Sequence, residues 1–120
     1  MRIEHRFLRT QAGNTRFARV RLSSEPSPGW IVTFAEPMSD STRRWRQAIE
    51  EALRVAIAWH ARRSDARLHV CFEDLIETYV DTSIDAIECA VIVAACMSFG
   101  WDESCATTYF AADRWNVRLS

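Results

Sequence analysis

The chain has 120 residues and a formal net charge of −1, with 48% apolar and 26% charged residues. This length is sufficient to bury a hydrophobic core, and the composition excludes disordered, collagen-like and coiled-coil proteins. The charged first residues exclude a signal peptide, and the longest uncharged run, residues 89–101, is shorter than the roughly 20 residues of a membrane span. We therefore expect a cytoplasmic protein without a membrane partner.

All fifteen basic residues are arginines, and the chain contains no lysine. This excludes the Gly-x-x-x-x-Gly-Lys-Ser/Thr loop on which P-loop GTPases depend. Residues 1–72 hold thirteen arginines and seven acidic residues, whereas residues 73–113 hold nine acidic residues and no arginine. The corresponding net charges of +6 and −9 predict surfaces of opposite sign that could face different partners.

The first third of the chain predicts three strands. Apolar and polar side chains alternate over residues 2–9 and again over residues 15–22, and residues 30–35 form an apolar run. Turn residues at 12–14 separate the first two strands. The proline-containing segment 24–29 predicts a hairpin between the second and the third.

Two helices and a fourth strand follow. Residues 40–42 are N-cap candidates for a helix that continues to about residue 60, and residues 66–73 alternate as a strand. A second helix is expected from Ser83 or Asp85 through Phe99. Because it is apolar all round, it lies either between the sheet and the first helix or in a subunit interface.

The end of the chain predicts one further strand, over residues 107–119. The four cysteines lack the paired spacing of a metal site, so we expect reduced thiols, no metal and no cofactor. His69 and Cys71 share a strand face, but the sequence supplies no third orienting group for catalysis. We therefore do not expect an enzyme.

Two segments resemble domain IV of elongation factor G. Residues 10–36, TQAGNTRFARVRLSSEPSPGWIVTFAE, contain a Gln-x-Gly turn followed by a Phe-Ala-Arg-Val strand. Residues 85–90, DAIECA, open a helix of small residues. The resemblance covers about residues 3–101 of a single domain spanning residues 1–120, and residues 102–120 form a C-terminal extension.

The resemblance implies the fold of the second domain of ribosomal protein S5. This is a two-layer α+β sandwich in which two helices cover one face of a sheet of about four strands, with a left-handed βαβ crossover. The C-terminal strand would be an addition to that fold. The hand of the crossover is implied by the resemblance alone, because right-handed connections are the general rule.

In the translocase, the tip of domain IV enters the decoding region of the small ribosomal subunit. The corresponding loops here are residues 36–42 and 73–84. The shorter segment 36–40 replaces the glycine-rich loop of the family, and the Gly-Ser-Tyr-His type of tip is absent. The two loops hold six acidic residues, which predict repulsion of RNA phosphates at the tip.

The sheet face turned away from the helices is the best candidate binding surface. If the apolar side chains of the strands contact the helices, the opposite face carries Phe17, Arg19, Arg21, Arg67 and His69. Three more arginines, Arg43, Arg44 and Arg46, lie just behind the tip. Arginines beside an aromatic ring suit phosphates and stacked bases, but they suit a protein or a second copy equally well.

The sequence therefore predicts a non-enzymatic binding module related to domain IV of translation factors, associated with the ribosome or with RNA. The alternative is a protein-interaction or self-assembling, homodimeric module. The second helix, the acidic loops and the extra C-terminal strand favour this alternative.

Overall fold

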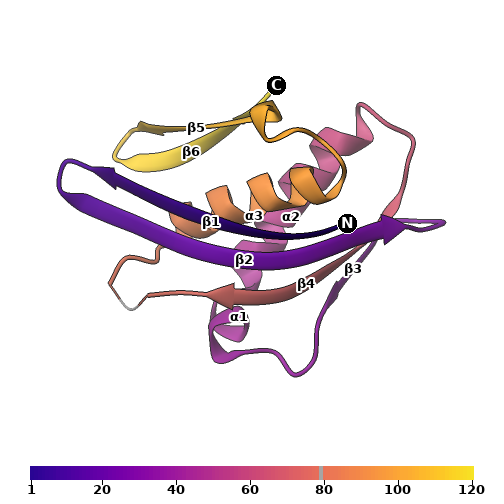
Figure 1. Cartoon of the computed structure of the whole chain (residues 1–120), viewed down its shortest axis with the longest axis horizontal. Helices are drawn as coiled ribbons and strands as arrows, with labels where there is room; N and C mark the ends of the chain where they lie inside the picture. Colours follow the sequence, from indigo (N-terminus) through magenta and orange to yellow (C-terminus); the bar gives the residue numbers. More distant parts are fainter. Residues whose placement is uncertain (79) are drawn as a thin grey trace.

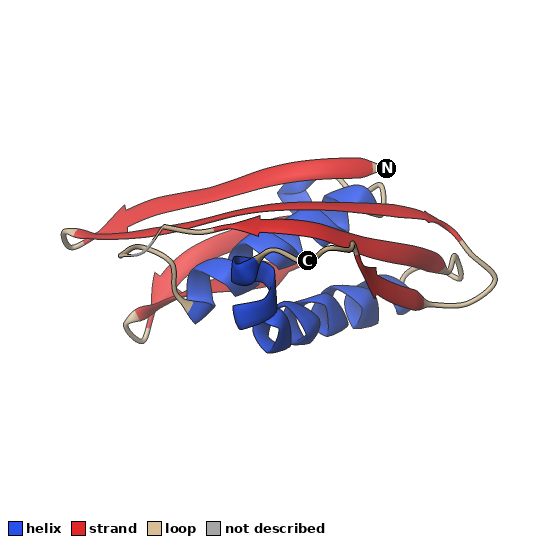
Figure 2. Cartoon of the chain, turned by 90° about the horizontal axis from the view of Figure 1, so that it is seen from below, coloured by secondary structure: helices blue, strands red, loops and turns tan. Residues whose placement is uncertain are grey.

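The computed structural model describes every residue of the chain except residue 79. Figure 1 shows a four-stranded sheet, two long helices and a C-terminal hairpin. The elements in chain order are β1 (Arg2–Gln11), β2 (Asn14–Pro26), β3 (Ile31–Phe34), α1 (Asp40–Arg44), α2 (Arg46–Ala61), β4 (Leu68–Ile76), α3 (Ile84–Ser98), the short 3-10 helix η1 (Glu103–Cys105), β5 (Ala106–Ala111) and β6 (Arg114–Leu119). The predicted two-layer α+β sandwich is confirmed, and its helices gather on one side of the long strands (Figure 2).

The strand order in the main sheet is β1-β2-β4-β3. β4 lies between β2 and β3, antiparallel to β2 and parallel to β3. The predicted hairpin over residues 24–29 is therefore wrong, because β2 and β3 are not neighbours. The parallel pair β3–β4 is connected through α1 and α2, as a βαβ crossover requires. The left-handed sense of this crossover stays a prediction.

The β1–β2 hairpin is set by a two-residue turn at Ala12 and Gly13, with φ angles of 52° and 80°. Positive φ at both central residues is characteristic of the type I′ turn, whose twist matches that of the flanking strands. The turn fixes the register in which Arg6 lies opposite Arg19. Consequently, the turn determines which side chains meet on each face of the sheet.

The segment from residue 36 to residue 46 differs in detail from the prediction. The helix N-cap is Ser39, whose side chain accepts a hydrogen bond from the Thr42 N–H, rather than a residue within 40–42. Trp45 leaves the helical conformation and separates α1 from α2. β4 also continues to Ile76, so that the first residues of the predicted acidic loop belong to a strand.

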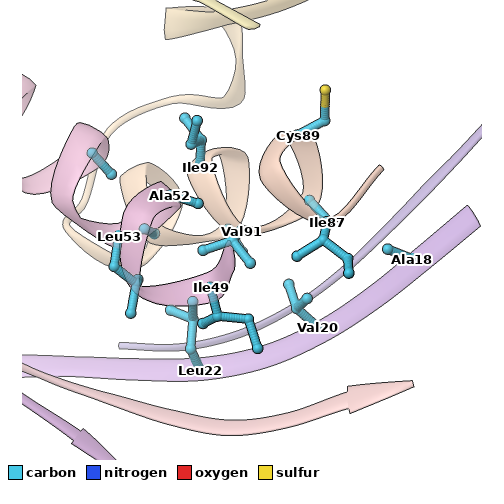
Figure 3. Close-up of a cluster of buried hydrophobic side chains, with 14 of the residues drawn as sticks. Ala18, Val20, Leu22, Ile49, Ala52, Leu53, Ile87, Cys89, Val91 and Ile92 are labelled. Carbon is cyan, nitrogen blue, oxygen red and sulfur yellow. The ribbon is translucent and has the colours of Figure 1, made fainter. Parts of the chain in front are cut away.

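The core lies between the sheet and the helices. Figure 3 shows Ala18, Val20 and Leu22 of β2 pointing toward α2 and α3. All three side chains are at most 1% exposed, as are Ile49 of α2 and Ile87 of α3. This confirms the predicted inner face of β2, because its alternate residues are the ones that meet the helices.

The apolar helix α3 is covered on all sides by its own chain. It packs on β1, β2 and α2, and the β5–β6 hairpin covers it from the side of β1 (Figure 1). Burial in this apolar surrounding raises the pKa of the Cys89 thiol to about 12. No second subunit is needed to bury α3, and of the two predicted positions the structure shows the intramolecular one.

The single C-terminal strand predicted over residues 107–119 is a two-stranded hairpin instead. Ala112 and Asp113 have φ angles of 55° and 64°, which again indicate a type I′ turn. Trp115 is buried, and its ring packs edge-on against Phe7 of β1. None of the helices in the described part of the chain is long and apolar enough to cross a membrane.

Candidate binding face on the open side of the sheet

The outward side chains of β1 and β2 form a ladder of pairs on the uncovered face of the sheet. Glu4 lies opposite Arg21, Arg6 opposite Arg19, and Leu8 opposite Phe17. Because alternate residues of a strand share one face, these consecutive pairs are neighbours on the same surface. We call this surface, together with Arg2 and Glu73, the open face.

Arginines outnumber acidic residues on the open face. Arg19 forms an ion pair with Glu4, and Glu73 of β4 lies 2.9 Å from Arg2 and 3.3 Å from Arg21. Two glutamates, Glu4 and Glu73, thus form ion pairs with three arginines, Arg2, Arg19 and Arg21. Arg6 has no ion pair among the described residues, although it lies directly opposite Arg19. Like charges placed opposite each other in a sheet are unfavourable, and a bound anion would relieve this repulsion.

Phe17 is held in place by the segment that precedes α3. Its N–H donates to the Asp81 carbonyl over 3.0 Å, and the Thr82 hydroxyl donates to the Phe17 carbonyl over 2.7 Å. Its cross-strand partner Leu8 is exposed. The Leu8–Phe17 pair therefore lies directly beside the Arg6–Arg19 pair. The backbone of Phe17 is held by β1 on one side and by residues 81 and 82 on the other.

His69 and Arg67 lie at the opposite end of the sheet from Phe17. His69 shares a 2.7 Å hydrogen bond between its Nε2 and the Thr33 hydroxyl of β3, and Glu25 lies 3.6 Å from its Nδ1. Arg67 precedes β4 and donates to the Pro28 carbonyl over 3.4 Å. These two residues are thus separated from the Arg6–Arg19 pair, to which Arg21 is adjacent.

The arginines behind the predicted tip do not join the open face. Arg43 lies 3.3 Å from Asp40, Arg44 forms an ion pair with Glu77, and Arg46 bonds Glu50 over 2.8 Å. Arg46 also stacks over the Phe34 ring at 4.5 Å. The predicted site residues therefore separate into three groups: Phe17, Arg19 and Arg21 on the open face, Arg67 and His69 at the other end of the sheet, and Arg43, Arg44 and Arg46 on the helix side.

The two predicted tip segments contact each other. Glu77 accepts hydrogen bonds from Arg44 and from the Trp45 indole, and the Thr42 hydroxyl donates to Asp74 and accepts from the Leu75 N–H. Of the six acidic residues, Asp74 thus has a partner in the other tip segment, whereas Asp40 and Glu77 bind residues 43–45 just behind it. Glu73 and Asp74 both belong to β4 and not to a loop as predicted, and Glu73 forms ion pairs on the open face.

Sequence reasoning missed the contribution of β1 to the open face. Arg2, Glu4, Arg6 and Leu8 alternate with inward-facing residues of a strand that the sequence did predict. The signal was therefore present in the alternation of residues 2–9. What the sequence did not supply is the register across the Ala12-Gly13 turn, which places Arg6 against Arg19.

A buried carboxylate on α3, that of Asp85, holds the C-terminal β5–β6 hairpin against this helix. Asp85, at the start of α3, accepts hydrogen bonds from the Trp115 N–H and the Ala86 N–H, each over 2.9 Å, and Arg16 lies 3.6 Å away. Burial opposes ionisation of this group. The hydrogen bonds from Ser83, Trp115 and Ala86 and the Arg16 charge outweigh it, so the pKa of Asp85 is below its ordinary value.

No protein-family model matches the sequence, and no curated protein matches it. Among solved structures, a crystal structure of a protein from Thermus thermophilus has a similar fold, with a TM-score of 0.60 and 18% sequence identity. The similarity covers 80% of this chain and 15% of the Thermus chain. The chain thus spans a small part of that protein's length, and at this identity the likeness concerns the fold alone.

Proposed function

We propose that this protein is a non-enzymatic binding module, related to domain IV of elongation factor G, that binds RNA through the open face. The observation that carries the proposal is the Arg6–Arg19 pair, placed directly beside the Leu8–Phe17 pair. Guanidinium groups bind phosphate oxygens with two parallel hydrogen bonds, and an aromatic ring offers a stacking surface to a base.

The charge of the open face supports an anionic partner. Its two glutamates already form ion pairs with Arg2, Arg19 and Arg21, which leaves Arg6 and an excess of positive charge for a ligand. Most of the affinity of a protein for RNA comes from neutralised phosphates, so this excess is the relevant quantity. Small-subunit ribosomal RNA is the first RNA to test, because of the resemblance to the translocase domain.

Co-sedimentation with small ribosomal subunits over a range of salt concentrations tests the proposal. We expect binding that weakens as salt rises, and a further loss on the order of tenfold in the double variant Arg6→Ala/Arg19→Ala. The variant Arg54→Ala/Arg62→Ala removes the same charge from α2 and its C-terminal end, outside the open face, and serves as the control. Equal binding by both double variants would contradict the assignment of the open face.

A protein-interaction or self-assembling module remains the alternative proposal. The buried state of α3 accounts for the apolar helix within one chain, so that helix no longer favours a dimer. Light scattering on the free protein decides between the two proposals. A stable dimer that does not sediment with ribosomal subunits would support self-assembly, whereas a monomer that does would support RNA binding.

A further inference from the structure

A buried hydrogen bond joins the end of α2 to the segment that follows α3. The Trp101 indole N–H donates to Nδ1 of His60 over 2.8 Å. The Trp101 ring also packs edge-on against Trp59, with the ring centroids 4.9 Å apart. His60 and Trp59 are both 4% exposed, so Trp101 helps to shield two side chains of the last turn of α2 from water. This contact belongs neither to the open face nor to the Asp85 site.

The direction of the hydrogen bond fixes the protonation state of His60. An indole nitrogen can only donate, so Nδ1 of His60 carries a lone pair and no proton. The neutral ring then holds its one proton on Nε2, which is buried and makes no hydrogen bond of good geometry with the described residues. Protonation adds a second proton at Nδ1, directly against the indole proton. The charged ring therefore cannot keep its bond to Trp101.

The rings packed around His60 favour its neutral form. Trp30, Phe99 and Trp101 lie with their centroids 5.6, 5.1 and 6.0 Å from that of His60. Burial lowers the pKa of His60, although the Ala66 carbonyl favours the protonated ring. His60 is thus neutral at neutral pH, and the contact with Trp101 is closed.

No charged side chain near this contact offsets the effect of burial. The charged or titratable residues of the surrounding elements are His5, Glu25, Arg62, Arg63, Asp65, Arg67, Cys96, Asp102, Glu103 and Cys105. None of these ten side chains contributes to the pKa of His60. Arg63 lies over the Trp59 ring at 4.4 Å, and Asp102 accepts a hydrogen bond from the Ser104 N–H. Burial raises the pKa of both thiols, so they stay neutral in mild acid.

The segment that Trp101 begins has few other contacts with the described part of the chain. The Trp101 N–H donates to the Cys96 carbonyl over 3.1 Å, and Gly100, with a φ angle of 100°, ends α3. Residues 102–104 are exposed. Cys105 is the next side chain that packs against the core. The Trp101 ring is therefore the contact that holds this segment against α2.

We propose that the His60–Trp101 contact is an acid-sensitive switch: protonation of His60 releases the Trp101 ring, exposes Trp59 and loosens the segment that leads into the C-terminal hairpin. The far end of the hairpin stays attached through the bond from the Trp115 N–H to Asp85. Histidine is the side chain whose charge changes in this pH range. The switch is independent of the RNA binding proposed for the open face.

The sign of the pH dependence follows from the burial of His60. Its pKa is lower in the folded protein than in the unfolded chain, where it is about 6.5. The stability that the neutral ring contributes is therefore complete above the unfolded value, and is lost as the pH falls through the folded value. Asp85, whose pKa lies below its ordinary value, remains ionised over this range.

A pH titration of the tryptophan fluorescence of the full chain tests the switch. From about pH 8 to about pH 5, the emission should move to longer wavelength with a midpoint below about 6.5, because Trp59 and Trp101 become exposed to water. In His60→Gln, the side-chain carbonyl accepts the indole N–H at every pH, so this shift should be absent. His5→Gln removes another histidine whose pKa is lowered by burial, and it should keep the wild-type shift.

Two further measurements keep the test decisive if His60→Gln fails to fold. Nitrogen-15 NMR of the wild type should show His60 with an unprotonated Nδ1 at neutral pH. Trp101→Phe removes the indole donor and should raise the pKa of His60, because the neutral ring loses its hydrogen bond. Far-ultraviolet circular dichroism should stay constant through the titration, since only a local contact opens.

Four results would overturn the proposal. They are an emission shift that is missing in the wild type or persists in His60→Gln, a protonated Nδ1 at neutral pH, an unchanged pKa of His60 in Trp101→Phe, and a loss of helical signal that accompanies the shift.

Discussion

The two faces of the main sheet are built from alternate residues of the same strands, yet they have different roles. On the inner face of β2, Ala18, Val20 and Leu22 are fully packed against α2 and α3 (Figure 3). On the outer face, Arg19 and Arg21 are partly exposed and form ion pairs with glutamates. Moving one residue along β2 thus leads from the core to the proposed binding surface. Substitutions on the inner face of β2 should therefore change the free energy of unfolding, whereas those on the outer face should change ligand binding.

The largest effect on stability is expected from the inner face. Leu22 is 0% exposed, so Leu22→Ala leaves a cavity in the core and should lower the free energy of unfolding by about 2–5 kcal/mol. Ser23→Ala, one residue further on the outer face, is the matched control and should change it little. Urea unfolding followed by circular dichroism measures both. Similar losses in the two variants would break the contrast between the faces.

The second largest effect on stability is expected from Asp85, the buried carboxylate at the start of α3. In Asp85→Asn, one carboxylate oxygen becomes an amide donor that faces the Trp115 or Ala86 N–H. We expect a loss of about 1–3 kcal/mol at neutral pH, because a buried N–H loses its acceptor. Thermal unfolding of both proteins measures this loss. An unchanged melting temperature would contradict the anchoring role of Asp85.

The same variant gives a pH dependence of known sign. The pKa of Asp85 is lower in the folded protein than in the unfolded chain, where it is about 3.9. Its contribution to stability is therefore complete above the unfolded pKa, and is lost as the pH falls through the folded value. The stability difference between wild type and Asp85→Asn should shrink below about pH 4. If the stability difference between wild type and Asp85→Asn grew on acidification, the pKa of Asp85 would be raised in the folded protein instead of lowered.

A smaller and stabilising effect is expected at the turn that sets both faces. Ala12 has a φ angle of 52°, a conformation that asparagine tolerates better than alanine. Ala12→Asn creates the Asn-Gly pair preferred in type I′ turns and should stabilise the protein by roughly 0.5–1 kcal/mol. A rise in melting temperature with unchanged RNA binding is the expected result. A fall would show that the turn differs from this description.

The smallest effect on stability is expected from the open face itself. Arg19→Ala removes an ion pair between two exposed side chains, which contributes at most about 0.5 kcal/mol. Chemical denaturation should therefore detect almost no change, although RNA binding weakens. A large loss of stability would mean that Arg19 has a structural role, and the binding data would then need a different explanation.

Much of the fold could be predicted from local patterns, and the errors have physical causes. Alternation identified β1, β2 and β4, and the apolar run identified α3. Prolines in segment 24–29 mark a connection but do not tell whether the next strand pairs with β2. The insertion of β4 between β2 and β3 is decided by tertiary packing.

The C-terminal hairpin was missed for a different reason. Its turn residues are Ala112 and Asp113, which lack the Asn-Gly signal of a type I′ turn, so residues 107–119 looked like one strand. Of the candidate site, Phe17, Arg19 and Arg21 could be assigned to one face from the alternation in β2. Their arginine partner Arg6 could not be paired with Arg19 without the register of the β1–β2 hairpin.

The most direct test of the central claim is the salt dependence of binding to a short labelled single-stranded RNA, measured by fluorescence anisotropy. For single strands, each neutralised phosphate contributes about 0.7 to the slope of log affinity against log salt. We expect Arg6→Ala/Arg19→Ala to reduce this slope by about 1.4, and Arg54→Ala/Arg62→Ala to leave it unchanged. Equal slopes in all three proteins, or no RNA binding by the wild type, would contradict RNA recognition by the open face.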